Sequence, residues 1–357
     1  MCQHDNTNDD FFQVLEDKYV SAKTGRAKAR PWSEKKMKNE YLAKAYDEID
    51  PNKAARLRQC GQYLSFRRYD DGTLKLDSMQ SCRVRLCPMC TWRRSLVNYA
   101  NNRKIVEYVE SQKPRGWILA TFTLKRCTAE QLDKQLDLLL YSWKKLMLNK
   151  RVKQAVKGAY RGVEITHDCA EYISADDYKR RKEYLKNYGL NVGDLNPTYD
   201  TYHCHIHAIL CVNKTYWSND TYMRHDEWVQ AWQQAIGCSY APVVNLKRIK
   251  PNSGDISGAV GEVSKYATKD SDFLSDDWDL TVNTVRLLDR VLNNRRFVSY
   301  SGVLLDAQKA LKLKDADNAD LTHIDGETAD NKDKPYSIET YFWYTGYRQY
   351  GRAKKAE

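Results

Sequence analysis

The sequence lacks a run of eighteen apolar residues, the length that a membrane-spanning helix requires. Its first residues, Met-Cys-Gln-His-Asp-Asn, are polar and do not form the apolar stretch of a secretory signal. Ten cysteines are spread over 357 residues, which is not the dense pattern of a small disulfide-stabilised domain. We therefore expect a cytoplasmic protein with no membrane partner, in which the cysteines are reduced thiols or metal ligands.

Negative charge is in deficit, because 47 Asp and Glu stand against 58 Lys and Arg, a net charge of +11. This excess favours a polyanionic partner, and nucleic acid more than an acidic membrane surface. The 25 tyrosines and 9 tryptophans can stack on unpaired bases or fill a core, so they do not decide the question. Apolar residues make up 42% of the chain, as expected for a globular protein with one large or two ordinary domains.

Histidine is scarce, yet three of the seven histidines fall within residues 201–212. Side chains of a strand alternate between faces, so His203, His205 and His207 share one face and mostly apolar residues occupy the other. Histidines two positions apart stand about 6–7 Å apart at Cα, close enough to bind one metal ion together. His203 and His207 are about 13 Å apart by the same rise, so one ion is not expected to bind all three. A row of surface histidines beside a buried strand is the alternative.

A second group of metal-ligand side chains consists of cysteines. Cys87 and Cys90 are separated by two residues, a spacing that lets two thiolates share one tetrahedral ion. Cys82 could add a third ligand, and Cys60 a fourth across a hairpin expected at residues 61–81. A lone C-x-x-C can instead be a redox pair. Structural zinc beside nucleic acid is favoured by the interleaved basic residues Arg83, Arg85, Arg93 and Arg94.

The first two of four predicted regions are basic. Residues 1–50 are predicted to form an arm followed by a helix, and the arm contains Arg30 and Trp32 as candidate DNA contacts. A merely solvated segment is the alternative for this arm. Residues 51–112 contain the cysteines and end in a predicted basic helix over 92–111.

The third region, residues 113–275, combines helices with strands predicted at 117–124, 159–166 and 201–212. Glu164 lies between two β-branched apolar residues, a pattern typical of the solvent face of a strand. Beside the histidine strand, its carboxylate could instead complete a metal site. The last region, residues 276–357, is predicted to be helical, with an acidic linker at 315–333 and a basic tail.

Residues 255–270 are predicted to form a helix that carries Glu262 and Tyr266 on one face, because the two are four residues apart. A tyrosine can attack phosphorus when a metal ion polarises the phosphate, and a carboxylate one turn away could act as a general base. Lys265 and Lys269 could supply positive charge to bind the DNA. A Tyr–Glu pair at this spacing also arises often by chance.

Taken together, these motifs resemble the replication initiators of Gram-positive rolling-circle plasmids, which belong to the HUH endonucleases. The resemblance rests on the order and spacing of Phe122-Thr-Leu124, Glu164-Ile-Thr, His205-Ile-His207-Ala-Ile-Leu and Glu262-Val-Ser-Lys-Tyr266. It continues through Arg30-Pro-Trp32, Arg85-Leu-Cys87-Pro-Met-Cys90 and Ser299-Tyr-Ser-Gly-Val, so it spans most of the chain.

The resemblance implies an α+β fold, with a HUH-type five-stranded antiparallel sheet, flanking helices and the histidines on a central strand. A small Cys-rich zinc-binding element and a helical C-terminal region would accompany it. His205 and His207 would hold Mg²⁺ or Mn²⁺, and Glu164 is the expected third ligand, since hard cations prefer oxygen. His203 is not a histidine in the family pattern, so its role stays open.

For Tyr266, the resemblance implies attack on a phosphodiester in a hairpin of the plasmid's double-strand origin, which is single-stranded at the nick site. A 5′-phosphotyrosyl intermediate and a free 3′-OH primer would result, and Glu262 would activate water for termination. The expected partners are this DNA and the host helicase and replication machinery in the bacterial cytoplasm, and the protein could act as a homo-oligomer. An HUH transposase or relaxase, or a zinc-stabilised DNA-binding protein without catalysis, are the alternatives.

Overall fold

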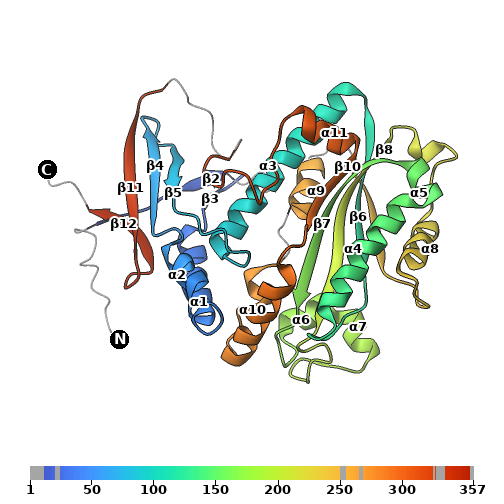
Figure 1. The fold of residues 1–357 in the computed structure, drawn as a ribbon, viewed down its shortest axis with the longest axis horizontal. Helices are drawn as coiled ribbons and strands as arrows, with labels where there is room; N and C mark the ends of the chain where they lie inside the picture. The colour runs from blue at the N-terminus through green and yellow to red at the C-terminus, as the bar shows by residue number, and fades with distance from the viewer. Residues whose placement is uncertain are drawn as a thin grey trace. The chain divides into compact units, whose positions relative to one another are not determined.

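The structure, a computed structural model, describes residues 12–20, 25–249, 255–264, 268–324, 326 and 334–353. The chain forms two compact units, one of Met1–Ala100 with Asp315–Glu357 and one of Asn101–Lys314. Each contains a five-stranded antiparallel sheet (Figure 1). Among the described residues, no helix is both long enough and apolar enough to cross a membrane.

The sheet of the first unit has the order β1-β12-β11-β4-β5. In this order, the strands are Phe12–Val14, Gln349–Ala353, Tyr336–Tyr344, Tyr63–Tyr69 and Leu74–Met79. β4 and β5 form the predicted hairpin, and Gly72 in its turn has a φ of 80°, which favours glycine. A two-stranded ribbon and two helices complete this part: β2 (Lys18–Val20), β3 (Ala27–Ala29), α1 (Trp32–Asp47) and α2 (Pro51–Gln59).

The middle strand of this sheet comes from the C-terminal region. β11 pairs with β4 on one side and with β12 on the other, so the sheet is assembled from both ends of the chain. The predicted regions 51–112 and 276–357 are therefore each divided between the two units. The cause is that residues 336–353 contribute strands to the first unit, whereas α10 (Trp278–Leu292) and α11 (Val303–Ala310) belong to the second.

The sheet of the second unit has the order β10-β7-β8-β6-β9, with every pair antiparallel. In this order, the strands are Val298–Gly302, Val156–His167, Tyr202–Asn213, Arg115–Thr123 and Val244–Ile249. The predicted five-stranded antiparallel sheet is thus confirmed, and the histidines lie on its central strand, β8. A second sheet of equal size was not predicted.

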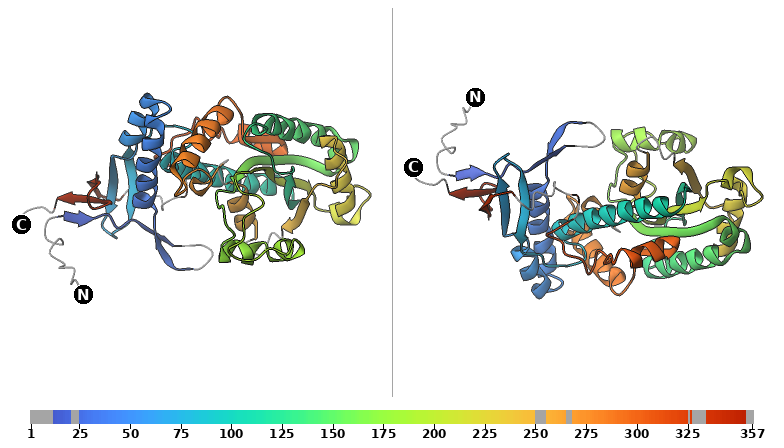
Figure 2. Two further views of the ribbon diagram at one scale, coloured as in Figure 1. Left: turned by 90° about the horizontal axis from the view of Figure 1, so that it is seen from below. Right: turned by 90° about the horizontal axis from the view of Figure 1, so that it is seen from above.

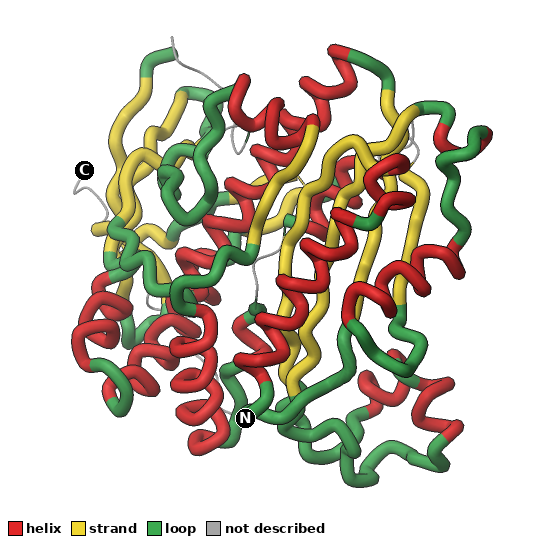
Figure 3. Tube along the Cα trace, turned by 45° about the vertical axis from the view of Figure 1, so that its right-hand side comes forward, coloured by secondary structure: helices red, strands yellow, loops and turns green. Residues whose placement is uncertain are grey.

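One face of the second sheet packs against α4 (Leu132–Leu148) and α8 (His225–Ile236), and Figure 3 shows α4 crossing this face. Phe122 on β6 contacts three tryptophans of these helices, with ring centroids 5.3–6.1 Å away: Trp143, Trp228 and Trp232. Phe122 pairs with Ile206, so this apolar face is the one opposite the histidines.

The remaining helices of the second unit are α3 (Pro88–Gln112, shared with the first unit), α5 (Lys150–Ala155), α6 (Ala175–Arg180), α7 (Lys182–Asn187) and α9 (Asp255–Val263). The short α6 and α7 lie in the long connection from β7 to β8. In both views of Figure 2, this light-green segment stands out to the side of the sheet. α9 packs on β8 and β9 and carries the predicted Glu262.

Candidate functional site

Three side chains converge on one face of the second sheet. Antiparallel pairing places Glu164 of β7 directly opposite His205 of β8, and Gly162 opposite His207. His205 Nε2 and His207 Nε2 lie 3.3 Å and 2.9 Å from the same oxygen, Glu164 Oε2. Ligands about 2.1 Å from an octahedral ion are about 3.0 Å apart on adjacent vertices. These three side chains could therefore hold one metal ion.

The Glu164 carboxyl is buried, with 4% of its surface exposed, so it does not occupy the solvent face of the strand. Burial alone would raise its pKa, but hydrogen bonds to His205, His207 and Lys269 outweigh burial and hold the pKa below its usual range. Lys269 Nζ lies 2.6 Å from the second oxygen, Glu164 Oε1. The group is thus an ionised carboxylate, which is the form that binds a cation.

Thr121 of β6 supports this group from the other neighbouring strand. It pairs with His207, and its Oγ1 lies 3.1 Å from His207 Nδ1. A hydroxyl can donate or accept, so it suits either tautomer and leaves Nε2 directed at Glu164. The sequence analysis missed Thr121. Thr121 and Phe122 are neighbours on a strand, so their side chains point to opposite faces of the sheet. Which of the two shares the face of the histidines depends on the register between β6 and β8, which the sequence does not give.

Replacing Thr121 by valine is expected to weaken divalent-ion binding by about 10–100-fold, because the ring of His207 loses the contact that orients it. Isothermal titration with Mn²⁺ measures this effect without any need for catalysis. Thr121→Ser keeps the hydroxyl and is the matched control. Equal Mn²⁺ affinity of the valine and serine variants would contradict this role.

His203 lies beside the triad without joining it. Its ring centroid is 5.3 Å from that of His205, and it pairs across the strands with Thr166. Burial is the main cause that lowers the pKa of His203 to about 4, and the positive charges of His205 and Arg126 lower it further. It is therefore neutral at physiological pH. The geometric expectation that one ion does not bind all three histidines agrees with this arrangement.

The C-terminal end of α9 approaches the same face. A Cβ atom at Gly162 would lie 2.9 Å from the Val263 carbonyl oxygen, so β7 passes close to the helix only because this residue has no side chain. Asn102 Nδ2 donates a hydrogen bond of 3.0 Å to the buried Ser264 Oγ, which follows the helix. Burial lowers the pKa of Lys269, but Glu164 outweighs it and raises this pKa, and the charge of the half-buried Glu262 adds a smaller contribution.

The predicted nucleophile Tyr266 and its neighbour Lys265 lie outside the described residues. Ser264 is the last described residue before them, and Lys269, which is described again, contacts Glu164. On the N-terminal side of Tyr266, Val263 lies beside Gly162 of β7. On the C-terminal side, Lys269 contacts Glu164.

The four predicted cysteine ligands form a second group, in the first unit. Cys60 Sγ lies 3.6 Å from the sulfurs of Cys87 and Cys90, and Cys82 Sγ lies 3.8 Å from that of Cys90. Sulfurs about 2.3 Å from a tetrahedral zinc ion are about 3.8 Å apart. All four side chains are buried. The backbone amides of Cys82, Arg83 and Cys90 donate to three of the sulfurs, those of Cys60, Cys90 and Cys87 respectively. The cluster could bind zinc.

The comparisons with known proteins identify the family of the chain. The family described as replication protein matches residues 73–351. The chain belongs to this family of replication proteins. Protein rep of Bacillus amyloliquefaciens is 32% identical, over 96% of this chain and 98% of its own length. Protein rep of Streptococcus pneumoniae is 28% identical, over 89% and 90% respectively. No solved structure matches the chain. The predicted resemblance is confirmed at the level of the family.

The arginines beside the cysteine cluster of this replication protein hold the returning C-terminal segment. Arg93 is fully buried and donates to the carbonyl oxygens of Leu321 and Thr322, at 2.7 Å and 3.0 Å. Arg94 is 2% exposed and pairs with Asp317. The prediction of DNA contacts is corrected for these two, because their guanidinium groups are enclosed within the protein.

Arg83 and Arg85 contact the same segment of the replication protein but remain more accessible. Arg83 donates to the carbonyl oxygens of Asp317 and Ala319, both at 3.0 Å, and Arg85 pairs with Asp317 at 3.2 Å. DNA binding by these two stays a prediction.

The N-terminal arm is tied to the first unit through Asp17. Trp32 Nε1 donates to the Asp17 carboxylate at 2.8 Å, and Arg30 Nε pairs with it at 3.2 Å. Trp32 is 2% exposed and packs edge-to-face on Phe66. The prediction that Trp32 contacts DNA is therefore corrected: its ring fills the core of the replication protein. For Arg30 the prediction is untested.

Proposed function

We propose that this replication protein is a rolling-circle initiator, a metal-dependent HUH endonuclease that nicks and joins plasmid origin DNA. The observation that carries the proposal is the convergence of His205, His207 and the ionised Glu164 on one point, beside the helix that leads into Tyr266. Membership of a replication-protein family supports the same reaction, since initiation requires a primer end.

In the proposed reaction, Tyr266 Oη attacks the scissile phosphorus and loses its proton. A P–O bond forms to tyrosine, and the P–O bond to the 3′-oxygen breaks, so the DNA gains a 5′-phosphotyrosyl end. The leaving oxygen takes up a proton and becomes the 3′-OH primer. Mg²⁺ or Mn²⁺, when bound by His205, His207 and Glu164, supplies Lewis-acid polarisation of the phosphate. Lys269, beside Glu164, adds positive charge where the attacked phosphate is negative.

Water, rather than a second tyrosine, is proposed to end the cycle. Glu262 lies four residues before Tyr266 in the sequence and close enough to Lys269 to contribute to its pKa, so its carboxylate is proposed to lie near the same phosphate. It is proposed to take a proton from the water that attacks the scissile phosphate in the second cleavage.

Changing Glu262 to Gln is therefore expected to leave the first nick intact and to reduce termination by about 10²–10⁴-fold, the usual contribution of general-base catalysis. A two-origin plasmid assay measures termination as release of unit-length circles against longer products. Glu262→Asp keeps a carboxylate and should recover part of the activity. Normal unit-length release by the Gln variant would contradict this role.

The test of the proposed function is whether a covalent protein–DNA adduct forms. The full chain is incubated with a single-stranded origin hairpin and Mn²⁺ or excess chelator, and the products are separated on a denaturing gel. A slower-migrating adduct that requires Mn²⁺ is expected. Absence of an adduct at every Mn²⁺ concentration, with DNA binding retained, would favour a zinc-stabilised DNA-binding protein without catalysis.

An HUH transposase or relaxase is the other enzyme candidate. The match of the replication-protein family to residues 73–351 favours the initiator over these. Cys60, Cys82, Cys87 and Cys90 are proposed to hold a structural zinc ion in the initiator, and the host helicase and replication machinery are its proposed further partners.

A further inference from the structure

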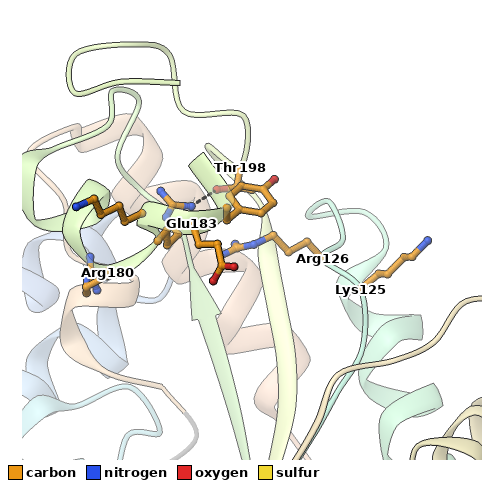
Figure 4. Close-up of a pocket in the computed structure, with 8 residues that line it drawn as sticks. Lys125, Arg126, Arg180, Glu183 and Thr198 are labelled. Carbon is orange, nitrogen blue, oxygen red and sulfur yellow. Dashed lines mark hydrogen bonds between the residues drawn. The ribbon is translucent and has the colours of Figure 1, made fainter. Parts of the chain in front are cut away.

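A pocket of about 780 Å³ opens in the second unit, between the end of β6 and the α6–α7 segment. Figure 4 shows the Arg126 side chain extending from the β6 end toward the residues around Glu183. The walls are strongly cationic, with five basic residues: Lys125, Arg126, Arg180, Arg181 and Lys182. None of the site residues predicted from the sequence lies in this pocket.

Positive charge exceeds negative charge in this pocket even after internal pairing. Arg181 pairs with Asp168 at 3.3 Å, and Arg180 pairs with Asp177. Glu183 is the carboxylate that lines the pocket itself. Five cations against these three carboxylates leave two positive charges in excess. Within the described part of the chain, Lys182 has no carboxylate at ion-pair distance, so its ammonium group is available to an anion.

Aromatic side chains accompany these cations. Tyr184 lines the pocket with 42% of its surface exposed, and its ring lies 4.8 Å from that of Tyr188, which is 67% exposed. The exposed parts of these rings gain no free energy from burial, and their faces can stack on unpaired bases. Cations next to exposed rings are the combination that binds single-stranded nucleic acid.

The pocket lies near the start of β8, the strand that carries the histidines. Arg126 donates to Thr201 Oγ1 at 3.2 Å, and Thr201 immediately precedes β8. His205 follows four residues later on the same strand, a distance of about 13 Å along β8. A few nucleotides of extended single-stranded DNA can span this distance.

We propose that this pocket binds the sugar–phosphate backbone and bases of single-stranded DNA a few nucleotides from the scissile phosphate. The inference deepens the proposed function and rests on it for the placement of the scissile phosphate. Lys125, Arg126 and Lys182 would contact phosphates, and Tyr184 would stack on a base. Arg181, held by Asp168 and Thr198, would keep the wall of the pocket in place.

The test compares two double variants of the full chain in chelator, so that no cleavage occurs. Fluorescence anisotropy measures binding to a labelled oligothymidine over a range of salt concentrations. Lys125→Gln with Lys182→Gln should weaken binding about 25-fold at 0.1 M salt and make the slope of log affinity against log salt shallower by about 1.4. The matched control, Lys144→Gln with Lys145→Gln, removes two exposed charges from α4 and should change neither.

A third variant separates stacking from charge. Tyr184→Ala should weaken binding about tenfold and leave the salt slope unchanged, because no phosphate contact is lost. If the pocket variant loses no more affinity than the α4 control, or loses as much on a duplex as on the single strand, the proposal is overturned. The adduct assay with the origin hairpin is run in parallel. If the pocket variant loses oligothymidine binding but the wild-type protein forms no adduct, the result would support the pocket and contradict the proposed function.

Discussion

Replacing Tyr266 by Phe is expected to abolish the covalent protein–DNA adduct and reduce nicking of supercoiled plasmid to background. The variant lacks only the phenolic oxygen, which is the atom proposed to form the new bond to phosphorus. Glu262, four residues earlier in the sequence, is not expected to replace it, because its carboxylate is proposed to activate water and not to attack. The measurement is a denaturing gel with a labelled origin hairpin in Mn²⁺.

The same variant should bind Mn²⁺ with unchanged affinity, because the three metal-ligand side chains lie on β7 and β8. The position of Ser264 should also persist, since Asn102 donates a hydrogen bond to its Oγ. Glu262→Gln, four residues earlier in the sequence, is the matched control and should still form the adduct. An adduct of normal yield from the Tyr266→Phe protein would refute tyrosine as the nucleophile.

Replacing Cys90 by Ser is expected to release zinc and unfold the first unit while the second unit stays folded. Binding of a structural zinc ion contributes about 10–16 kcal/mol, as much as the entire stability of a typical domain. Cys90 Sγ contacts the sulfurs of Cys60 and Cys82 and accepts from the Arg83 amide, so its loss removes one zinc ligand and three contacts within the cluster. Burial also raises the pKa of the Cys87 thiol, which a bound cation would counteract.

Hydrogen exchange followed by mass spectrometry can resolve the two units. Amides of β4 and β5 in the first unit should lose protection in Cys90→Ser, while those of β8 in the second should keep it. Cys238→Ser is the matched control, because Cys238 is a half-buried cysteine outside the cluster. Bound zinc, counted by elemental analysis, should fall from one per chain to none. Retained zinc and retained protection would exclude a structural role for the cluster.

Features set by short stretches of chain could be predicted from the sequence. The alternation of residues 201–212 predicted the histidine face, and the C-x-x-C spacing predicted the cysteine cluster, because each depends on a few neighbouring residues. The hairpin at residues 61–81 could be predicted for the same reason, because its turn and its two strands are neighbours in the sequence. Glu164 needed the resemblance as well, since its own strand pattern is equally typical of a solvent face.

Features set by pairing across long distances could not be predicted. β11 pairs with β4 although more than 250 residues separate them, and no local pattern specifies such a partner. The arginine run was expected to face DNA because charge usually indicates exposure. Arg93 is buried instead, since carbonyl oxygens of Leu321 and Thr322 return to satisfy it. The contact of Thr121 with His207 could not be predicted for the same reason, because it depends on the register between β6 and β8.

The position of β11 in the middle of the first sheet has a consequence for biosynthesis. On the ribosome, β4 and β5 emerge early, but their sheet cannot close until β11 has followed the whole of the second unit out of the exit tunnel. The second sheet, whose strands all lie within residues 101–314, can form before that moment. The second unit is therefore expected to be complete while the first unit still exposes an unpaired strand edge, at which a chaperone could bind.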